Sequence, residues 1–490
     1  MRNLQSIFNS QNERGVSFLV YKISAVFVLV TALVTRLIFV FIYPSGGGDW
    51  DIYSTVAHNI LNGCGVSLSS PGWAECIPHF GGNQLPGFPA FVAVIWWLTN
   101  YSDIAIRVGQ TLCYVLALVW MMRAILALTG ATYLAILVGL TLAISPLQVA
   151  WPRFTQTETL ALATNIWVLA ELLLSLAESR LRTIPLSLAL IAAIFIRLDG
   201  ILLCATCALT CFLIYRPRQA FRKVILLGLI VTFPLALWAT RNIIVGLPVM
   251  PQGMVLPNNA PTPHGYIKWC RSWMTEEYQR PGAMYPVNRM IYSGIVIDDR
   301  AYDSFEERAE VELWLAELKN HDGQPFPHDL DIRFSQLAQE RTERNYYRAY
   351  ISNNFRRALA FWSNPFSSFA WPNELPGDFG HQTRLEVSRS DIGGVLALAI
   401  IFPFEALTKA LTSAYRYVLI GITLAAFFYA MCNSLSEVTR KIILLVAVTV
   451  TVRTLFFAIT NNIETRYTVE LVPWMELAAL LAWRGKNKKL

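Results

Sequence analysis

Long apolar stretches separated by short polar loops dominate the first half and the last fifth of the chain. The first stretch runs from Phe18 to Tyr43 and exceeds the roughly 20 residues that a helix needs to cross the hydrocarbon core of a bilayer. Similar stretches follow at about 104–128, 131–151, 157–177, 183–196, 199–215, 223–245, 415–432, 438–459 and 468–484. The pattern predicts an all-α polytopic membrane protein.

Basic residues in the short loops indicate which helix ends share one side of the membrane. Lys and Arg are enriched in short cytoplasmic loops, and this chain carries them around Arg123, Arg216 and Arg440. These loops fall on one side only if Leu85–Leu98 and Gly393–Ala406, which are short or interrupted by proline, do not cross. About ten spans with both termini cytoplasmic result, or about twelve if both segments cross.

This topology divides the chain into three parts. Residues 1–245 form an N-terminal transmembrane module with a first outer loop at 44–103, residues 246–390 form an extracytoplasmic insert, and residues 391–490 supply C-terminal transmembrane helices. Within the insert, Ser304 and Glu307 have the spacing of a capping box, and residues 331–362 are expected to form one further helix.

Composition excludes several other protein classes. Hydrophobic residues make up 54% and charged residues 15%, against about 25% charged in average soluble chains, which rules out intrinsic disorder and collagen. Forty Lys and Arg against 33 Asp and Glu give a net charge of +7, which a polytopic protein places in cytoplasmic loops. Nucleic-acid binding is therefore disfavoured. Cys64 and Cys76 share the first outer loop and could form a disulfide in an oxidising compartment.

Two carboxylates stand at predicted outer helix ends. Asp49 opens a stretch whose apolar residues recur every four positions up to Asn62-Gly63, which predicts a short amphipathic helix on the outer surface. Glu158 begins a later apolar helix on the same side. Asp49 or Asp51 could serve only as a helix N-cap. Carboxylates near membrane depth are costly and often functional, so Asp49 and Glu158 also form a candidate acid/base or substrate-orienting pair.

Several arginines lie at outer span ends, against the loop bias. They are Arg107, Arg153, Arg197, Arg241 and Arg466. Each alone could snorkel or pair with a carboxylate, whereas the set favours a phosphate-bearing ligand because guanidinium forks match phosphate oxygens. Asp199 and Glu171 do not fit this outer arrangement. The sequence contains no Walker loop, so a nucleotide cofactor is not indicated. Its His residues do not have the spacing of metal ligands.

The order of several short motifs is the most specific signal. They are Gly48-Asp49-Trp50-Asp51-Ile52-Tyr53, Leu85-Pro86-Gly87-Phe88-Pro89, Ile106-Arg107, Thr157-Glu158-Thr159-Leu160, Ile196-Arg197-Leu198-Asp199-Gly200, Trp238-Ala239-Thr240-Arg241-Asn242 and Glu464-Thr465-Arg466-Tyr467. This succession resembles the GT-C membrane glycosyltransferases, especially the group with protein O-mannosyltransferases and bacterial aminoarabinose transferase (glycosyltransferase family 39-like). The resemblance covers nearly the whole chain except the insert.

The resemblance implies both a fold and a reaction. The fold is a GT-C-type bundle of about 10–12 transmembrane helices with juxtamembrane helices and an extracytoplasmic insert. The family's catalytic carboxylate maps onto Asp49, with Asp51 as a close rival, and its second outer acid maps onto Glu158. Relatives transfer a sugar from a polyprenyl-phosphate donor outside the cytoplasm, so the resemblance implies a hexosyl- or pentosyltransferase of the cell envelope.

The chemistry that this donor needs can be assigned to candidate residues. A lipid-phosphate sugar carries its own leaving group, so no cofactor is required; a divalent metal is compatible with the reaction but not necessary. Asp49 would act as the base for an acceptor hydroxyl, with inversion. Arg241 and Arg466 are the first choices for the donor phosphate, with Arg107, Arg153 and Arg197 behind them.

The acceptor and the location follow less directly. The acceptor is a glycan, a lipid or a protein, and the aromatic side chains of Tyr266, Trp269 and Trp273 could stack on its sugar rings or anchor the insert at the interface. The expected location is a bacterial cytoplasmic (inner) membrane, with the active site facing the periplasm or exterior. The main alternative is a polytopic transporter or lipid flippase, in which outer-facing charges line a pathway; a membrane-anchored binding protein is a second.

Overall fold

All regular elements of the described chain are helices. A computed structural model describes residues 2–43, 49–68, 76–79, 85–249, 256, 260–363, 370–371, 392–432 and 435–487, with the side chains of 2–20, 392 and 483–487 left out. Within these ranges the only extended pairing is a single bridge between Ser67 and Pro78. The predicted all-α class is confirmed. Gly48 of the first motif lies outside the described residues.

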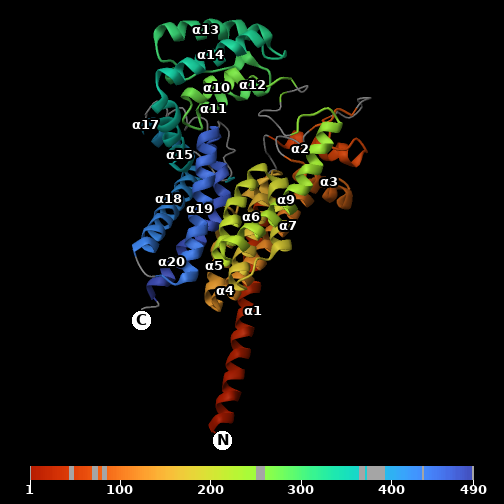
Figure 1. Cartoon of the computed structure of the whole chain (residues 1–490), viewed down its shortest axis with the longest axis vertical. Coiled ribbons are helices and arrows are strands. Elements are labelled where there is room, and N and C mark those ends of the chain that lie inside the picture. Colours follow the sequence, from red (N-terminus) through yellow and green to blue (C-terminus); the bar gives the residue numbers. More distant parts are fainter. Residues whose placement is uncertain are drawn as a thin grey trace.

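A bundle of long helices forms the body of the molecule (Figure 1). In chain order its helices are α1 (Arg2–Ile42), α4 (Asp103–Thr129), α5 (Thr132–Ile144), α6 (Glu158–Ala177), α7 (Thr183–Ile196), α8 (Leu203–Ile214), α9 (Pro217–Ile244), α18 (Pro403–Cys432), α19 (Glu437–Thr460) and α20 (Val472–Asn487). By length and composition, six described helices could cross a membrane: α1, from Tyr21 on, α4, α6, α9, α18 and α19. This confirms a polytopic membrane protein, while the count of ten or twelve spans stays a prediction.

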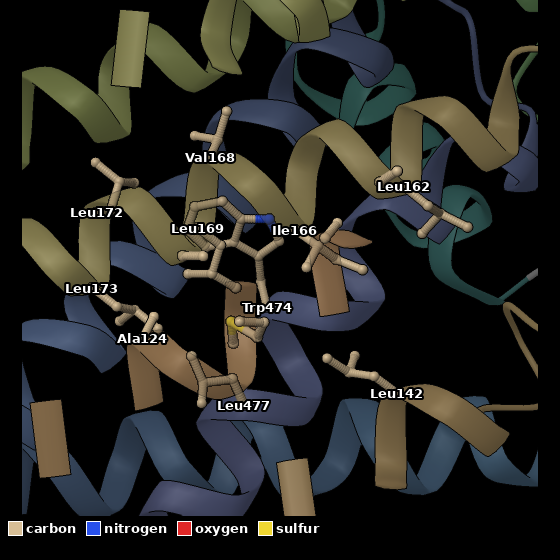
Figure 2. Close-up of a cluster of buried hydrophobic side chains, with 14 of the residues drawn as sticks. Ala124, Leu142, Leu162, Ile166, Val168, Leu169, Leu172, Leu173, Trp474 and Leu477 are labelled. Carbon is tan, nitrogen blue, oxygen red and sulfur yellow. The ribbon is translucent and has the colours of Figure 1, made fainter. Parts of the chain in front are cut away.

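Helix α6 is the central element of the bundle. It packs against α4, α7 and α20, and nearly all of its side chains are buried. Figure 2 shows the indole of Trp474, from α20, lying beside Ile166 and Leu169 of α6. Helices inside a bilayer gain little from hydrophobic burial, because lipid tails are also apolar, so this close packing is what holds them together. Glu158 at the start of α6 is thereby held in a fixed position.

Short elements cover the end of the bundle that lies away from both chain termini (Figure 1). Helices α2 (Trp50–Leu61) and α3 (Gly87–Thr99) belong to the first outer loop, and α2 ends just before Asn62-Gly63, as predicted. Three 3₁₀ turns join longer helices: η1 (Trp151–Arg153), η2 (Leu198–Leu202) and η8 (Thr465–Leu471). At 13 residues, α3 is too short to span a membrane upright, which agrees with its expected non-crossing role.

The insert forms a separate helical cap at the same end (Figure 1). Its helices are α10 (His264–Trp273), α11 (Gln279–Ala283), α12 (Tyr285–Asn288), α13 (Phe305–Leu318), α14 (His328–Arg344) and α15 (Asn353–Ser363), with short 3₁₀ turns at η4 (Tyr292–Gly294), η5 (Asp299–Ala301) and η6 (Lys319–His321). The predicted capping signal is present, since the Glu307 N–H donates to Ser304 Oγ at 3.1 Å. The Glu307 carboxylate accepts from the Asp303 N–H at 3.3 Å.

Two predicted helix boundaries are wrong. Residues 331–362 do not form one helix: α14 ends at Arg344, and η7 (Arg348–Ser352), a π-helical turn, precedes α15. The cause is Asn345, whose side-chain oxygen accepts the Arg348 N–H at 2.8 Å and so competes with the helical hydrogen bonds. Helix α18 begins at Pro403, after α17 (Ile392–Ile401), and not near residue 415. Lys409 and Arg416 interrupt the apolar run in the sequence, yet the helix continues through both residues and buries them.

The two ends of the bundle predict the result of a topology experiment. Reporter fusions after residues 155, 300 and 463 are expected to report one side of the membrane, because these positions lie at the end that carries the insert. Fusions after residues 180, 216 and 435 are expected to report the other side. A cytoplasmic signal at 155 together with an external signal at 463 would contradict this arrangement.

Candidate functional site

A network of charged side chains lies where α6, α7, α19, η2 and η8 meet. We call it the charge network, and it consists of Arg197, Arg280, Arg453, Arg466, Asp49, Glu158, Asp199, Glu464 and Glu470. Four guanidinium groups therefore face five carboxylates. Buried charges are costly unless they are paired and hydrogen-bonded, so the way in which these groups share partners determines the properties of the site.

The inner part of the network is sealed. Arg453 Nη2 lies 2.6 Å from Asp199 Oδ2 and 2.9 Å from Glu470 Oε2. Arg197 Nε lies 3.1 Å from Glu470 Oε1 and 3.3 Å from Asp199 Oδ1. Asn165 adds a further hydrogen bond to Glu470 at 2.9 Å. All of these side chains are buried, so we assign this part to holding α6, α19 and η8 together.

The outer part of the network reaches solvent. Arg466 Nη1 lies 3.7 Å from Asp49 Oδ2 and 3.6 Å from Glu158 Oε1, and its Nε lies 2.6 Å from Glu464 Oε2. The side chains of Asp49 and Arg466 are 27% and 31% exposed, whereas that of Glu158 is 4% exposed. Arg197 holds Glu158 from the interior at 3.3 Å. Asp49 and Arg466 are thus the accessible edge of a buried network.

Local packing explains where the Asp49 carboxylate lies. Asp49 occupies the N-cap position of α2, yet its side chain makes no capping hydrogen bond, so its role is not that of a simple cap. The rings of Tyr53 and Phe88, from α2 and α3, meet edge-to-face at 4.9 Å. At Gly87, an added Cβ would lie 2.4 Å from the Phe195 carbonyl oxygen, so only glycine lets α3 lie this close to the end of α7.

Asp51 lies in a different environment from Asp49. It occupies the first turn of α2, where it is exposed, and its backbone carbonyl accepts hydrogen bonds from Ser54 and Thr55. Positions two residues apart on a helix do not face each other. The structure therefore separates two carboxylates that the sequence could not distinguish.

Asp49 and Glu464, the two neighbours of Arg466 that lie outside the membrane-spanning helices, have pKa values shifted in opposite directions. Burial raises the pKa of Asp49 above its ordinary value; the Arg466 guanidinium opposes this rise, and the neighbouring Glu158 and Glu464 reinforce it. Burial alone would also raise the pKa of Glu464, but Arg466 and Arg280 hold it below the usual range. Glu464 is consequently a fixed anion, and Asp49 is the more basic group of the pair.

The insert takes part in holding Arg466 in place. Arg280 of α11 lies 2.6 Å from Glu464 and donates to the Asn462 side chain. Glu277 accepts hydrogen bonds from the Thr465 N–H at 3.1 Å and from the Thr465 hydroxyl at 2.8 Å. Both contacts lie on the segment that ends in Arg466, so the insert and the bundle build the site jointly.

Several network members were missed by the sequence analysis. Arg280 lies in an insert without a recognisable motif, and Glu464 was seen only as part of one. Arg453 and Glu470 lie within predicted apolar runs. Charged residues are rare in such runs and are often functional, so their position alone could have identified them as candidates. Their partners come from distant positions in the chain and could not be read from local patterns.

The predicted phosphate-binding arginines do not share one environment. Arg241 donates to the backbone carbonyls of Val66 and His79 at 2.6 and 2.8 Å, and so ties α9 to the first outer loop. Arg107 donates to the carbonyls of Val40 and Tyr43 at 2.8 and 3.2 Å. Both terminal nitrogens of Arg241 donate to backbone carbonyls, so Arg241 has an anchoring role, as Arg107 has; the choice of Arg241 as a first phosphate ligand stays a prediction.

Arg153 and Arg197, two further arginines of the predicted phosphate-binding set, are buried. Arg153 is 2% exposed, and its guanidinium lies over the ring of Phe154 at 4.3 Å. Arg197 is 3% exposed and fully engaged with carboxylates of the charge network. Arg466 is therefore the member of the predicted set that combines network contacts with solvent access.

The aromatic residues predicted to bind the acceptor lie in the core of the insert. Tyr266 and Trp269 are completely buried and Trp273 is 6% exposed. The Tyr266 hydroxyl donates to the Ala283 carbonyl at 2.8 Å, and its ring meets Phe334 edge-to-face at 5.1 Å. Neither face of Tyr266 or Trp269 is open to a sugar, so the stacking role is corrected to core packing for both residues.

Ion pairs explain the two acids that did not fit the outer arrangement. Asp199 is held by Arg197 and Arg453 in the charge network. Glu171, near the other end of α6, accepts from the Trp120 indole at 2.6 Å and from Arg182 at 2.8 Å. Neither carboxylate needs a transport role to account for its position.

The first outer loop is cross-linked. Cys64 and Cys76 form a disulfide, as the sequence analysis allowed, next to the carbonyls that Arg241 holds. Among the residues that the structure describes, no group of three or more His, Cys, Asp or Glu side chains could hold a metal ion. The expectation that no cofactor is required stays a prediction.

Comparisons with known proteins give matches only at the level of structure. No family model and no curated protein matches the chain. A crystal structure of ArnT from Cupriavidus metallidurans in the apo state has 14% sequence identity and a TM-score of 0.38, over 92% of this chain and 77% of that chain. The same protein bound to undecaprenyl phosphate has 15% identity and a TM-score of 0.36, over 86% and 81%. ArnT is an aminoarabinose transferase of the GT-C group.

The sealed part of the network predicts a large stability effect. Replacing Arg453 by Leu leaves Asp199 and Glu470 without their shortest ion pair, and breaking a buried pair in this way costs about 3–5 kcal/mol. We expect a clear fall in the midpoint of thermal unfolding of the detergent-solubilised protein. Arg440, exposed on the same helix, is the matched control, and Arg440→Leu should leave the midpoint nearly unchanged. Equal midpoints for the two variants would contradict the assignment.

Proposed function

We propose that this protein is a membrane glycosyltransferase that moves a sugar from a polyprenyl-phosphate donor to an acceptor hydroxyl on the extracytoplasmic side, with inversion. The observation that carries the proposal is the placement of Asp49 and Arg466 at the accessible edge of an otherwise sealed charge network. An acceptor-activating base and a cation for a leaving phosphate are the two groups that this reaction needs. The order of the sequence motifs supports the same assignment.

The proposed reaction is a single displacement. The acceptor oxygen attacks the anomeric carbon and forms the new glycosidic bond, while the bond from that carbon to the phosphate oxygen breaks. The Asp49 carboxylate takes the proton of the acceptor hydroxyl, and the electron pair of the broken bond leaves with the lipid phosphate. Arg466 stabilises the negative charge that develops there, acting as a preorganised cation. The raised pKa of Asp49 suits a group that must accept a proton.

Glu158 and Arg197 act as positioning residues in this proposal. Glu158 is too buried to meet an acceptor without rearrangement. Its carboxylate lies 3.6 Å from Arg466 and 3.3 Å from Arg197, so Arg197 fixes Glu158 and Glu158 helps to hold Arg466 in place. Because the donor carries its own leaving group, the proposal requires no cofactor. A divalent metal is compatible with it, as the leaving phosphate would then share its charge between the ion and Arg466.

The proposed location is the bacterial cytoplasmic membrane, with the site facing the periplasm or exterior. Basic loops occupy the end of the bundle opposite the charge network, in agreement with the positive-inside rule. The Cys64–Cys76 disulfide lies at the network end, where an oxidising compartment would stabilise it. The alternative of a transporter loses its support, because Asp199 and Glu171 are accounted for by ion pairs.

Substitution of Asp49 tests the proposed base. Asp49→Asn removes the proton acceptor at nearly constant volume, so we expect transfer from a polyprenyl-phosphate sugar to fall at least a hundredfold, within the range that general-base catalysis supplies (about 10²–10⁴). Transfer of radiolabelled sugar by purified protein provides the measurement. Asp51→Asn is the matched control and should retain most activity, since Asp51 is exposed and outside the network. The reverse pattern would move the base to Asp51.

The pKa shift of Asp49 predicts a pH dependence. Asp49 must be ionised to accept a proton, and burial raises its pKa, so activity should fall on acidification at a pH above the ordinary carboxyl range. Arg466 lowers this pKa, hence Arg466→Gln should move the acidic limb of the rate profile to higher pH as well as reduce the rate at its plateau. A limb that stays in place or moves to lower pH would show that Arg466 does not act on the base.

A further inference from the structure

Arg280 carries a positive charge from the insert into the charge network. It lies on α11, and its side chain is 18% exposed. Its Nη1 lies 2.6 Å from Glu464 Oε1 and also donates to the side-chain oxygen of Asn462. Both acceptors lie on the segment that leads from α19 to Arg466. Arg280 therefore joins the insert to the segment that carries the proposed phosphate-binding cation.

Contacts within the insert fix the position of Arg280. A helix of five residues such as α11 is not stable by itself in water, so it depends on its neighbours. The buried Tyr266 hydroxyl donates to the carbonyl of Ala283, the last residue of α11, at 2.8 Å. At the other end, the Gln279 side-chain oxygen accepts the Thr275 N–H at 2.8 Å. The core of the insert thus determines where the Arg280 guanidinium lies.

Glu464 divides its two carboxylate oxygens between two arginines. Oε1 lies 2.6 Å from Arg280 Nη1, and Oε2 lies 2.6 Å from Arg466 Nε. A carboxylate that faces a single guanidinium frequently takes two of its nitrogens at once, in a bidentate pair. Because Arg280 occupies Oε1, Glu464 holds Arg466 through one oxygen only.

The terminal nitrogens of Arg466 consequently have only weak partners in the network. Nη1 lies 3.7 Å from Asp49 and 3.6 Å from Glu158, beyond the usual hydrogen-bond distance, and Nη2 donates to the neighbouring Tyr467 hydroxyl at 3.3 Å. Two such nitrogens form the planar fork that binds phosphate oxygens at two points. A phosphate that reaches Arg466 therefore displaces no close ion pair of these nitrogens.

We infer that Arg280 is a positioning residue for the donor: by occupying one oxygen of Glu464, it keeps the terminal nitrogens of Arg466 available to the lipid phosphate. Without Arg280, Arg466 is the remaining close cation of the buried Glu464 carboxylate among the residues that the structure describes. The bidentate pair that these two would form competes with the phosphate. The inference rests on the proposed function and gives the insert a part in regulating donor binding at that same site.

Binding of two lipids to the full-length protein in detergent tests this inference. The probes are radiolabelled undecaprenyl phosphate and undecaprenol, which share one chain and differ in the phosphate, so that affinity is measured without turnover. We expect Arg280→Gln to weaken undecaprenyl phosphate binding about tenfold, within the range of coupling between contacting residues, and to leave undecaprenol binding unchanged. Arg289→Gln, an exposed substitution on the same insert, is the matched control and should change neither affinity.

A double variant separates this positioning role from a structural one. Glu464→Gln removes the competing charge and keeps the side-chain shape, so its addition to Arg280→Gln should restore undecaprenyl phosphate binding to within about threefold of the wild type. A double variant as weak as Arg280→Gln would overturn the inference, and so would an equal loss of undecaprenol binding in Arg280→Gln. If Arg280→Gln does not fold, Glu464→Gln alone serves as the test: it should bind undecaprenyl phosphate at least as tightly as the wild type, and weaker binding would contradict the inference.

The proposed function and this inference fail in different ways. Asp49→Asn should lose transfer and keep undecaprenyl phosphate binding, because Asp49 acts on the acceptor; retained transfer would refute the proposed base and leave the binding result for Arg280 untouched. Equal binding of both lipids by the wild type would remove the phosphate donor from the proposed function, and the inference with it. A wild-type preference for undecaprenyl phosphate that Arg280→Gln fully retains would overturn the inference alone.

Discussion

Among the residues that the structure describes, the charge network holds one carboxylate more than it holds guanidinium groups, and the site depends on how these groups share partners. Five carboxylates share four guanidinium groups, and the three held most tightly lie within 2.6–2.9 Å of a guanidinium: Asp199, Glu464 and Glu470. Asp49 meets Arg466 only at 3.7 Å. The carboxylate with the weakest ion pair is thus also the most exposed one.

Backbone geometry delivers the Arg466 cation to that carboxylate. Helix α19 ends at Thr460, and the C-cap residue Asn461 has a φ of 55°, the left-handed conformation that turns the chain sharply after a helix. The following residues, Asn462, Glu464 and Thr465, are then held by Arg280 and Glu277 of the insert. Since Glu464 also binds Arg466 Nε, the insert fixes one side of the guanidinium and leaves Nη1 directed to Asp49 and Glu158. The insert is therefore part of the site's framework.

Local signals were predictable from the sequence, and long-range partners were not. The amphipathic α2 with its stop at Asn62 and the Ser304 cap depend on neighbouring residues, so their patterns sufficed. Arg241 and Arg466 both stand at outer helix ends in apolar surroundings, yet one binds backbone carbonyls and the other carboxylates. The difference depends on which acceptor groups distant parts of the chain place beside each arginine, and the local sequence does not contain this information. The same holds for Tyr266 and Trp269 of the insert, because Tyr and Trp are common both in sugar-stacking sites and in protein cores.

The identity of the proposed base follows from burial rather than from sequence. Asp49 and Asp51 flank Trp50, whose ring meets Trp96 of α3 edge-to-face at 5.8 Å and so fixes how α2 lies on its neighbour. With α2 held in this way, Asp51 lies exposed in the first turn, and Asp49 remains at the helix start, 3.7 Å from Arg466. Moving the register of α2 by two residues would exchange the two carboxylates. The packing of α2 on α3 therefore selects the base, and the aromatic contacts beneath the site are as much a condition for the proposed chemistry as the charges above them.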